Sequence, residues 1–316
     1  MQRYMPYIAF PMVLLGGLWI CSSLFGPLEN PALAPFVVIL AWAIPWMIFL
    51  EWWTPYREAW SRNHGDVKTD VIYLLLIQSL WPRLLSAFWI TALASATIWC
   101  SQNLQFFDGQ SWPHHWPLAL QLVLALLLAE FGRYWVHRWA HEVSFLWRFH
   151  AVHHSVERLY WLNAARFHPV EKILLHIPET LPFILLGANA EVLALYFVTT
   201  GIHGLFQHSN IKLKLGPFNY VFAMAELHRF HHSKVIRESN SNYGNNLIIW
   251  DLVFGTFYWP KRREVGDIGL LNPEYPKSFL HQCLAPFHKA KLDKPADYAS
   301  NPEKYQQSEQ SLSRTQ

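Results

Sequence analysis

Four long apolar segments restrict the fold more than any other feature of the sequence. They cover residues 7–25, 34–52, 71–99 and 118–136, and each is close to or above the roughly 20 residues that a helix needs to cross a bilayer. Pro82 and Arg83 interrupt the third segment, which predicts a kinked span or two shorter helices. The first segment is followed by no small-residue cleavage site, so we interpret it as a span and not as a signal peptide. We expect an all-α integral membrane protein with about four transmembrane helices.

The composition agrees with a membrane-embedded chain. Only 15% of the 316 residues are charged, whereas a soluble protein carries about 25%. The 17 tryptophans favour the same interpretation, because Trp gathers at bilayer interfaces. The net charge of +3 without a long basic block argues against a nucleic-acid partner. Cys21, Cys100 and Cys283 are isolated, which argues against a zinc ribbon and a disulfide framework.

Lys and Arg are distributed unevenly between the spans. Residues 53–70 contain Arg57, Arg62 and Lys68, residues 101–117 contain neither Lys nor Arg, and residues 138–172 contain five of them. Loops rich in Lys and Arg stay in the cytoplasm. The distribution therefore predicts a cytoplasmic amino terminus and places the segment after the fourth span in the cytoplasm.

Three histidine clusters follow the fourth span. One is an H-x-x-x-H pair and two are H-x-x-H-H sets; the eight residues are His137, His141, His150, His153, His154, His228, His231 and His232. These intervals place side chains on one face of a helix, and neutral imidazole is the commonest metal ligand. A single histidine would more often be a packed or solvated side chain, but the repeated pattern indicates a metal centre.

The number and type of these ligands limit the metal. Eight histidines exceed the four ligands of structural zinc and the six of an octahedral ion, so we expect two ions. Carboxylates are scarce, which excludes the Glu-x-x-His di-iron bundle. Imidazole suits Zn, Cu, Fe and Ni alike. A two-metal centre beside a bilayer would meet lipid chains, whose unactivated C–H bonds need a redox metal and dioxygen, and this favours iron.

The third cluster must reach the same side of the membrane as the first two. The apolar region 173–202 lies between them and is broken by Pro178, Pro182 and Gly187. A single crossing would separate the clusters, so we predict a re-entrant helical hairpin with its bend at residues 187–189. The clusters then share one cytoplasmic helical cap.

Two further histidines are ligand candidates. His208 is the stronger one, and His203, five residues earlier, would diverge from it by about 140° on a regular helix. His168 precedes Pro169 and so lies in extended or turn backbone, which favours an orienting or structural role over ligation.

Three polar residues could brace the ligands. Glu130 lies two helical turns before His137 and could orient His137 or His141, or it could pair with Arg133. Asn242 and Asp251 could brace the third cluster, or they could be ordinary turn and cap residues.

The sequence around these residues resembles the fatty acid hydroxylase superfamily, in particular its bacterial, sterol desaturase-like members. The matching segments are residues 137–141, 146–155, 166–171, 208–210, 228–233, 242–244 and 250–256. Glu130 stands where members often have Asp, and Ala225-Glu226 stand where a proline is often found. The resemblance covers residues 118–259. We divide the chain into a transmembrane region (1–117), a catalytic domain (118–263) and a cytoplasmic carboxyl-terminal region (264–316) that is polar beyond residue 293.

The resemblance implies a multi-pass enzyme of a bacterial inner membrane, with its active site on the cytoplasmic face. Such an enzyme would use two iron ions and O2 to hydroxylate or desaturate a lipid. Ligand roles carry over to the eight cluster histidines, and also to His208 and His203. The sequence contains no flavin, haem, nicotinamide or ferredoxin motif, so we expect a separate reductase system as the electron-donating partner.

Other functions would use the same histidines. A metal transporter should place ionisable ligands near the bilayer midplane, whereas these clusters follow the spans. A zinc-dependent membrane hydrolase would share the surface placement but need no O2. A lipid- or metal-binding protein without turnover also fits the pattern. Sterols, fatty acyl chains, alkylglycerol ethers and carotenoids all remain possible substrates.

Overall fold

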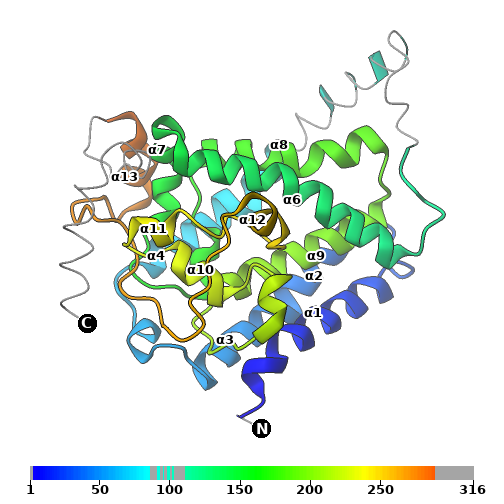
Figure 1. Ribbon diagram of the computed structural model, residues 1–316. Coiled ribbons are helices and arrows are strands. Elements are labelled where there is room, and N and C mark those ends of the chain that lie inside the picture. The colour runs from blue at the N-terminus through cyan, green and yellow to red at the C-terminus, as the bar shows by residue number, and fades with distance from the viewer. Residues whose placement is uncertain are drawn as a thin grey trace.

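The computed structural model describes residues 3–85, 91, 92, 95, 98, 99, 102 and 111–288. Helices build this part of the chain (Figure 1), and it contains three isolated β-bridges but no β-strand. The all-α prediction is confirmed for the described residues. The predicted polar tail, residues 293–316, lies outside them.

Three described helices are long and apolar enough to cross a membrane. The first is α1 (Met5–Ser23). The second runs from Pro31 to Trp53 and consists of η1 (Pro31–Leu33), α2 (Ala34–Val38), a π-helical turn η2 (Ile39–Ala43) and α3 (Ile44–Trp53). The third is α6 (Leu118–Glu142). These helices coincide with the first, second and fourth predicted spans.

The third predicted span is described only at its beginning. The short turn η3 (Glu58–Ser61) precedes α4 (Val67–Ile72), which continues as the π-helix η4 (Tyr73–Leu80) and remains helical to Leu85. Pro82 and Arg83 lie inside this helical stretch and do not end it. Most of the remaining span lies outside the described residues, so the number of membrane crossings stays a prediction.

Two helices form the predicted hairpin. α8 (Pro169–Leu186) ends at Gly187, whose φ of 75° is the left-handed conformation that glycine adopts without strain. α9 (Ala190–Gln207) begins after Asn189, whose side chain accepts a hydrogen bond from the Val192 N–H. The bend therefore lies at the expected residues. That the hairpin enters and leaves on one side of a bilayer remains a prediction.

The hairpin packs beside α6 (Figure 1), and a close approach holds α6 against α8. A Cβ atom added at Gly132 would lie 2.5 Å from the Pro178 Cβ, so only glycine fits there. One residue further along, the Arg133 guanidinium forms a 2.9 Å ion pair with Glu179, and both side chains are buried. The α6–α8 contact fixes the direction in which α6 leaves the bundle.

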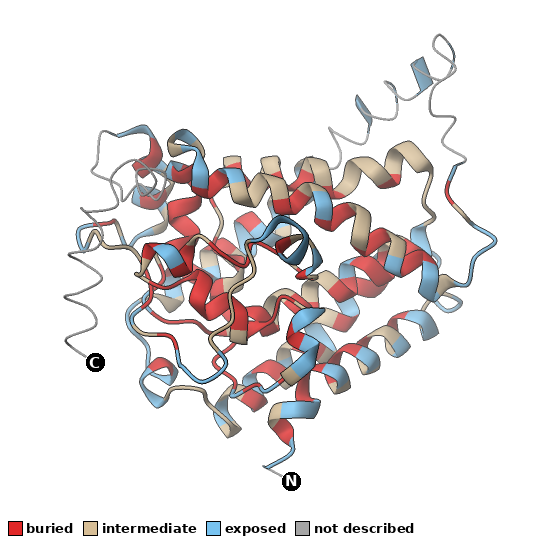
Figure 2. Cartoon of the chain, in the orientation of Figure 1, coloured by how far each residue is buried: buried red, intermediate tan, exposed pale blue. Residues whose placement is uncertain are grey.

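The cap at the end of the bundle is made of short helices and loops. In chain order its helices are α7 (Ser144–His154), η5 (Trp161–Ala165), η6 (Gly216–Tyr220), α10 (Ala225–His231), α11 (Ile236–Ser239), α12 (Ile249–Phe254), α13 (Phe279–Leu284) and η7 (Ala285–Phe287). Figure 2 shows that the segments in the middle of the cap are mostly buried. The histidine clusters lie in this interior.

We expect Gly132→Ala to destabilise the protein, because its methyl group would collide with a rigid proline ring. Overpacking of this kind costs about 1–3 kcal/mol. Thermal unfolding in detergent measures the effect. The matched control is Gly204→Ala in α9, where an added Cβ would meet no atom within 4 Å. Equal thermal stability of the two variants would contradict the close approach of α6 and α8.

Candidate metal centre

Nine histidines converge in two groups within the cap. The first group contains His137, His141, His150, His154 and His231, and the second contains His153, His208, His228 and His232. Within each group, one ring nitrogen of every member lies within 4.8 Å of those of the others. The structure thus brings together the eight cluster histidines and His208.

Each H-x-x-H-H set divides its ligands between the two groups. On α7, His150 and His154 face the first group, with their Nε2 atoms 3.0 Å apart, while His153 faces the second. On α10 and the residue after it, the division is reversed. His228 and His232 face the second group at 3.0 Å, while His231 reaches across to the first. The repeated motif is therefore the means by which two helices hold both groups together.

The hydrogen bonds of the rings test whether metal ions fit these groups. His137, His153 and His231 direct Nδ1 to the carbonyl oxygens of Tyr243, Arg166 and Ser241, at 2.7, 3.2 and 2.8 Å. A carbonyl oxygen only accepts, so Nδ1 carries the proton and a neutral ring presents a bare lone pair on Nε2.

Burial keeps these rings neutral. It lowers the pKa of His153 and His231 well below the usual histidine value. The Nε2 atom of His231 lies 3.1 Å from that of His154, and the buried Nε2 atom of His141 has no hydrogen-bond partner among the described residues. Lone pairs crowded in this way repel one another unless a cation lies between them. The nine side chains therefore fit metal ions.

Comparison with known proteins decides which family this arrangement represents. The family model for fatty acid hydroxylase matches residues 122–256. Ornithine lipid hydroxylase OlsE of Rhizobium tropici is 36% identical over 282 residues, which are 89% of this chain and 84% of that protein. The chain belongs to the fatty acid hydroxylase family. The predicted family is thereby confirmed.

More distant members of the family show its range. Alkylglycerol monooxygenase of Homo sapiens is 31% identical over 191 residues, 60% of this chain and 41% of that protein. Methylsterol monooxygenase 1 of Rattus norvegicus is 24% identical over 152 residues, 48% of this chain and 50% of that protein. The chain spans half or less of the length of these two relatives. No solved structure matches this member of the family.

One bracing residue of this fatty acid hydroxylase family member was missed by sequence reasoning. The Glu171 carboxylate lies 2.5 Å from His150 Nδ1, and both side chains are buried. The corresponding partners of His141 and His208 are the amide oxygens of Asn240, at 3.2 Å, and Asn163, at 3.0 Å. Glu171 thus gives His150 an acidic partner, and such a partner orients the ring and raises its basicity.

The predicted bracing role of Asp251 has a specific form in the structure. Its carboxylate accepts hydrogen bonds from the backbone N–H groups of Tyr243 and Gly244, each at 2.8 Å. The Tyr243 carbonyl in turn accepts from His137. Asp251 therefore acts on His137 through one peptide unit. It braces the first cluster, whereas the sequence suggested the third.

Asn242 ties the same loop to α10. It has a left-handed φ of 56°, and its side chain bonds the Leu227 carbonyl and both backbone groups of Tyr258 at 2.8–3.2 Å. Leu227 immediately precedes His228. This contact is consistent with the predicted bracing of the third cluster.

Glu130 takes neither of the two roles that the sequence suggested for it. Its carboxylate accepts hydrogen bonds from the backbone N–H groups of Asn245 and Asn246, and Arg133 pairs with Glu179 instead. Glu130 lies two helical turns before His137 on α6, and its side chain faces the loop that follows Tyr243 instead of the histidines. Glu130 thus holds the loop that holds His137.

His168 and His203 lie outside both groups. His168 caps α8 by accepting from the Val170 N–H, and its second nitrogen lies 3.0 Å from the Cys283 carbonyl oxygen, which is a structural role. His203 is buried edge-on against Phe10, with ring centroids 5.6 Å apart. The structure does not bring His203 to the other histidines.

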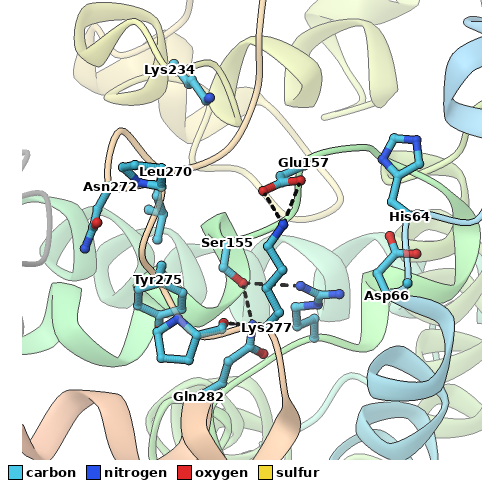
Figure 3. Close-up of a pocket in the computed structure, with 14 residues that line it drawn as sticks. His64, Asp66, Ser155, Glu157, Lys234, Leu270, Asn272, Tyr275, Lys277 and Gln282 are labelled. Carbon is cyan, nitrogen blue, oxygen red and sulfur yellow. Dashed lines mark hydrogen bonds and ion pairs between the residues drawn. The ribbon is translucent and has the colours of Figure 1, made fainter.

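A polar pocket is lined in part by residues that follow the two H-x-x-H-H sets in the chain (Figure 3). Ser155, which follows His154, lies at its centre, and its hydroxyl accepts from Arg166 and Gln282 at 3.3 and 3.2 Å. Lys234, two residues after His232, lies on the opposite wall. The lining of the pocket therefore includes a residue that closely follows His154 of the first group and a residue that closely follows His232 of the second group in the chain.

We expect Glu171→Gln to weaken metal binding, because the amide keeps the shape of the carboxylate but loses its negative charge beside His150. Loss of such a partner typically lowers metal affinity by about 10- to 100-fold. Competition with a chelator, followed by elemental analysis, measures the affinity. Glu157→Gln is the control, since Glu157 is exposed and pairs only with Lys277 at the surface. Equal metal retention in both variants would show that Glu171 does not support His150.

Proposed function

We propose that this protein is a membrane-bound di-iron oxygenase that uses O2 to hydroxylate or desaturate a lipid. The observation that carries the proposal is the convergence of nine neutral imidazoles in two adjoining groups. Family members named as lipid hydroxylases and monooxygenases support an oxidoreductase. When bound, iron supplies the redox chemistry with O2 that an unactivated C–H bond requires, which the side chains cannot supply themselves.

The histidines would act as ligands, and the residues around them would hold their orientation. His137, His141, His150, His154 and His231 would hold one ion; His153, His208, His228 and His232 would hold the other. Glu171 and the backbone carbonyls fix the ring tautomers through Nδ1. The rings that have such a partner then present Nε2 to the metal position, which is the task of the surrounding hydrogen bonds.

Aromatic rings would keep water away from the centre. Phe167 stacks on His153 with centroids 4.6 Å apart, and Trp147 lies 5.2 Å from His141. A dry site strengthens the electrostatic interactions within it and limits side reactions. The protein would therefore contribute positioning and the exclusion of water.

The relative that covers most of this chain suggests the substrate class. Its printed name describes a hydroxylase of ornithine lipid, and the match extends well beyond the histidine-rich segments. We therefore place an amino-acid-containing membrane lipid first among the candidate substrates. The same comparison favours hydroxylation over desaturation.

The proposed location follows from the predicted topology, and the proposed electron source follows from the lack of a flavin, haem, nicotinamide or ferredoxin motif in the sequence. We place the centre on the cytoplasmic face of a bacterial inner membrane, with electrons delivered by a separate reductase system. The polar pocket of Figure 3 supports this arrangement, because its lining includes Ser155, directly after His154, and Lys234, two residues after His232. A water-soluble partner could approach the centre closely there.

We expect His153→Ala and His231→Ala each to lose iron and to abolish lipid oxidation, because each variant removes a ligand from a different group. Iron per chain and product formation are the measurements. His115→Ala is the control, since His115 is exposed and distant in sequence from every cluster. Full activity in either ligand variant would refute the assignment.

Labelled dioxygen distinguishes the proposed reactions. We expect mass spectrometry of membrane lipids from cells with the active protein to show a product carrying one heavy oxygen atom from labelled O2. Desaturation would instead remove two hydrogens without adding label. Lipid turnover by the zinc-loaded protein without O2 would contradict an oxygenase and indicate a hydrolase.

A further inference from the structure

A patch of exposed apolar side chains covers two short elements of the cap, η6 and α12. We call it the η6–α12 patch; its members are Phe218, Tyr220, Val221, Ile249, Leu252 and Val253. Phe218 is 62% exposed and Val253 is 61% exposed. Figure 2 shows α12 as a largely exposed coil lying in front of buried segments. Exposed apolar patches mark contact surfaces in proteins.

The opposite side of α12 is firmly anchored. Asp251 is fully buried and accepts from the backbone of Tyr243 and Gly244. Trp250 packs against Phe131 of α6 with ring centroids 4.8 Å apart, and Phe254 packs against Trp135 at 4.9 Å. α12 therefore has a fixed position beside the carboxyl-terminal half of α6, and its apolar face is held outward.

This position gives the depth of α12 in a bilayer. α6 begins at Leu118, and about 20 residues are needed to cross the hydrocarbon core. Phe131 and Trp135 then lie in the leaflet nearest the metal centre, and α12 lies beside them. Phe222, next to η6, contacts Phe10 of α1 with centroids 5.3 Å apart, in the second turn of that span. Both parts of the patch thus lie beside candidate spans, and Phe131 of α6 is itself 45% exposed.

Positive charges border the patch. The Lys261 ammonium lies over the rings of Tyr220 and Trp259, at 5.4 and 5.1 Å from their centroids. Lys212, Lys214 and Arg262 are exposed nearby in the chain. Aromatic rings edged by Lys and Arg are typical of the membrane–water boundary, where anionic headgroups attract the cations.

We propose that η6 and α12 dock in the plane of the membrane, in the leaflet nearest the metal centre. The apolar patch contacts acyl chains, and Lys212, Lys214, Lys261 and Arg262 contact anionic headgroups. A lipid leaflet fits better than a second protein copy because the patch lies beside the first turns of α1 and beside α6, whose exposed apolar side chains include Phe131 and Trp139. Two hydrogen bonds connect the docked helix to His137. Asp251 of α12 accepts from the Tyr243 N–H, and the Tyr243 carbonyl accepts from His137.

Spin labels test the docking directly. The full chain, with its three cysteines replaced, carries Val253→Cys or, as control, Glu274→Cys on an exposed loop of the cap. Each is labelled with a nitroxide and reconstituted in vesicles of phosphatidylethanolamine and phosphatidylglycerol. We expect the label at position 253 to be relaxed more by O2 than by a water-soluble nickel complex, and the label at position 274 to show the reverse. The same aqueous response at both positions overturns the proposal.

Two further outcomes are decisive. Dipolar coupling between position-253 labels of different chains would mean that a second copy covers the patch, which overturns lipid docking. Lys261→Glu combined with Arg262→Glu should make the label at position 253 shallower in vesicles with phosphatidylglycerol, but not in vesicles of phosphatidylcholine alone. An unchanged depth in both compositions overturns the headgroup contact.

Discussion

Nine imidazoles, eight of them buried and His137 half-buried, direct nitrogen lone pairs at one another. The arrangement is unfavourable without positive charge, and the surrounding structure holds it in place. Backbone carbonyls, two asparagines and Glu171 fix Nδ1 of six of the nine rings. Asn163 is held in turn, because its side-chain amide donates to the Arg158 carbonyl. The packing of the cap therefore holds these rings so that their Nε2 atoms face the other histidines of the group.

Helices of the membrane region also support this arrangement. Glu51 of α3 accepts hydrogen bonds from the backbone N–H groups of Trp161 and Asn210, at 2.7 and 2.9 Å. These residues flank Asn163 and His208, so a carboxylate on a candidate span positions part of the second group. Asp66 and Asp70 similarly hold Arg158 and Arg166. The predicted boundary at residue 117 thus divides a chain whose two parts share buried ionic contacts.

Much of this could be predicted because the relevant signals are local. Apolar length identified the described spans, and the intervals between histidines identified the residues that meet in the two groups. Gly187 and Asn189 marked the bend of the hairpin. The angular argument that separated His203 from His208 agrees with their positions in the structure, where only His208 reaches the other histidines.

The supporting contacts could not be predicted because they join residues far apart in the chain. Glu171 lies 21 positions from His150, and no spacing rule connects a helix start to a ring on the preceding helix. Glu130 had the correct periodicity for His137 but faces a loop that follows Tyr243. Periodicity reports the face of a helix, whereas the neighbour across that face depends on the tertiary fold.

The division of each H-x-x-H-H set between two groups has a consequence for how such a chain can vary. One inserted residue between His150 and His153 would rotate the following side chains by about 100°, and the helix would lose its ligands to both groups at once. Segments between the clusters are under no such restriction, because they only have to return the chain to the cap. Length can therefore change between the motifs during evolution, while within them it is fixed by the angle between neighbouring side chains.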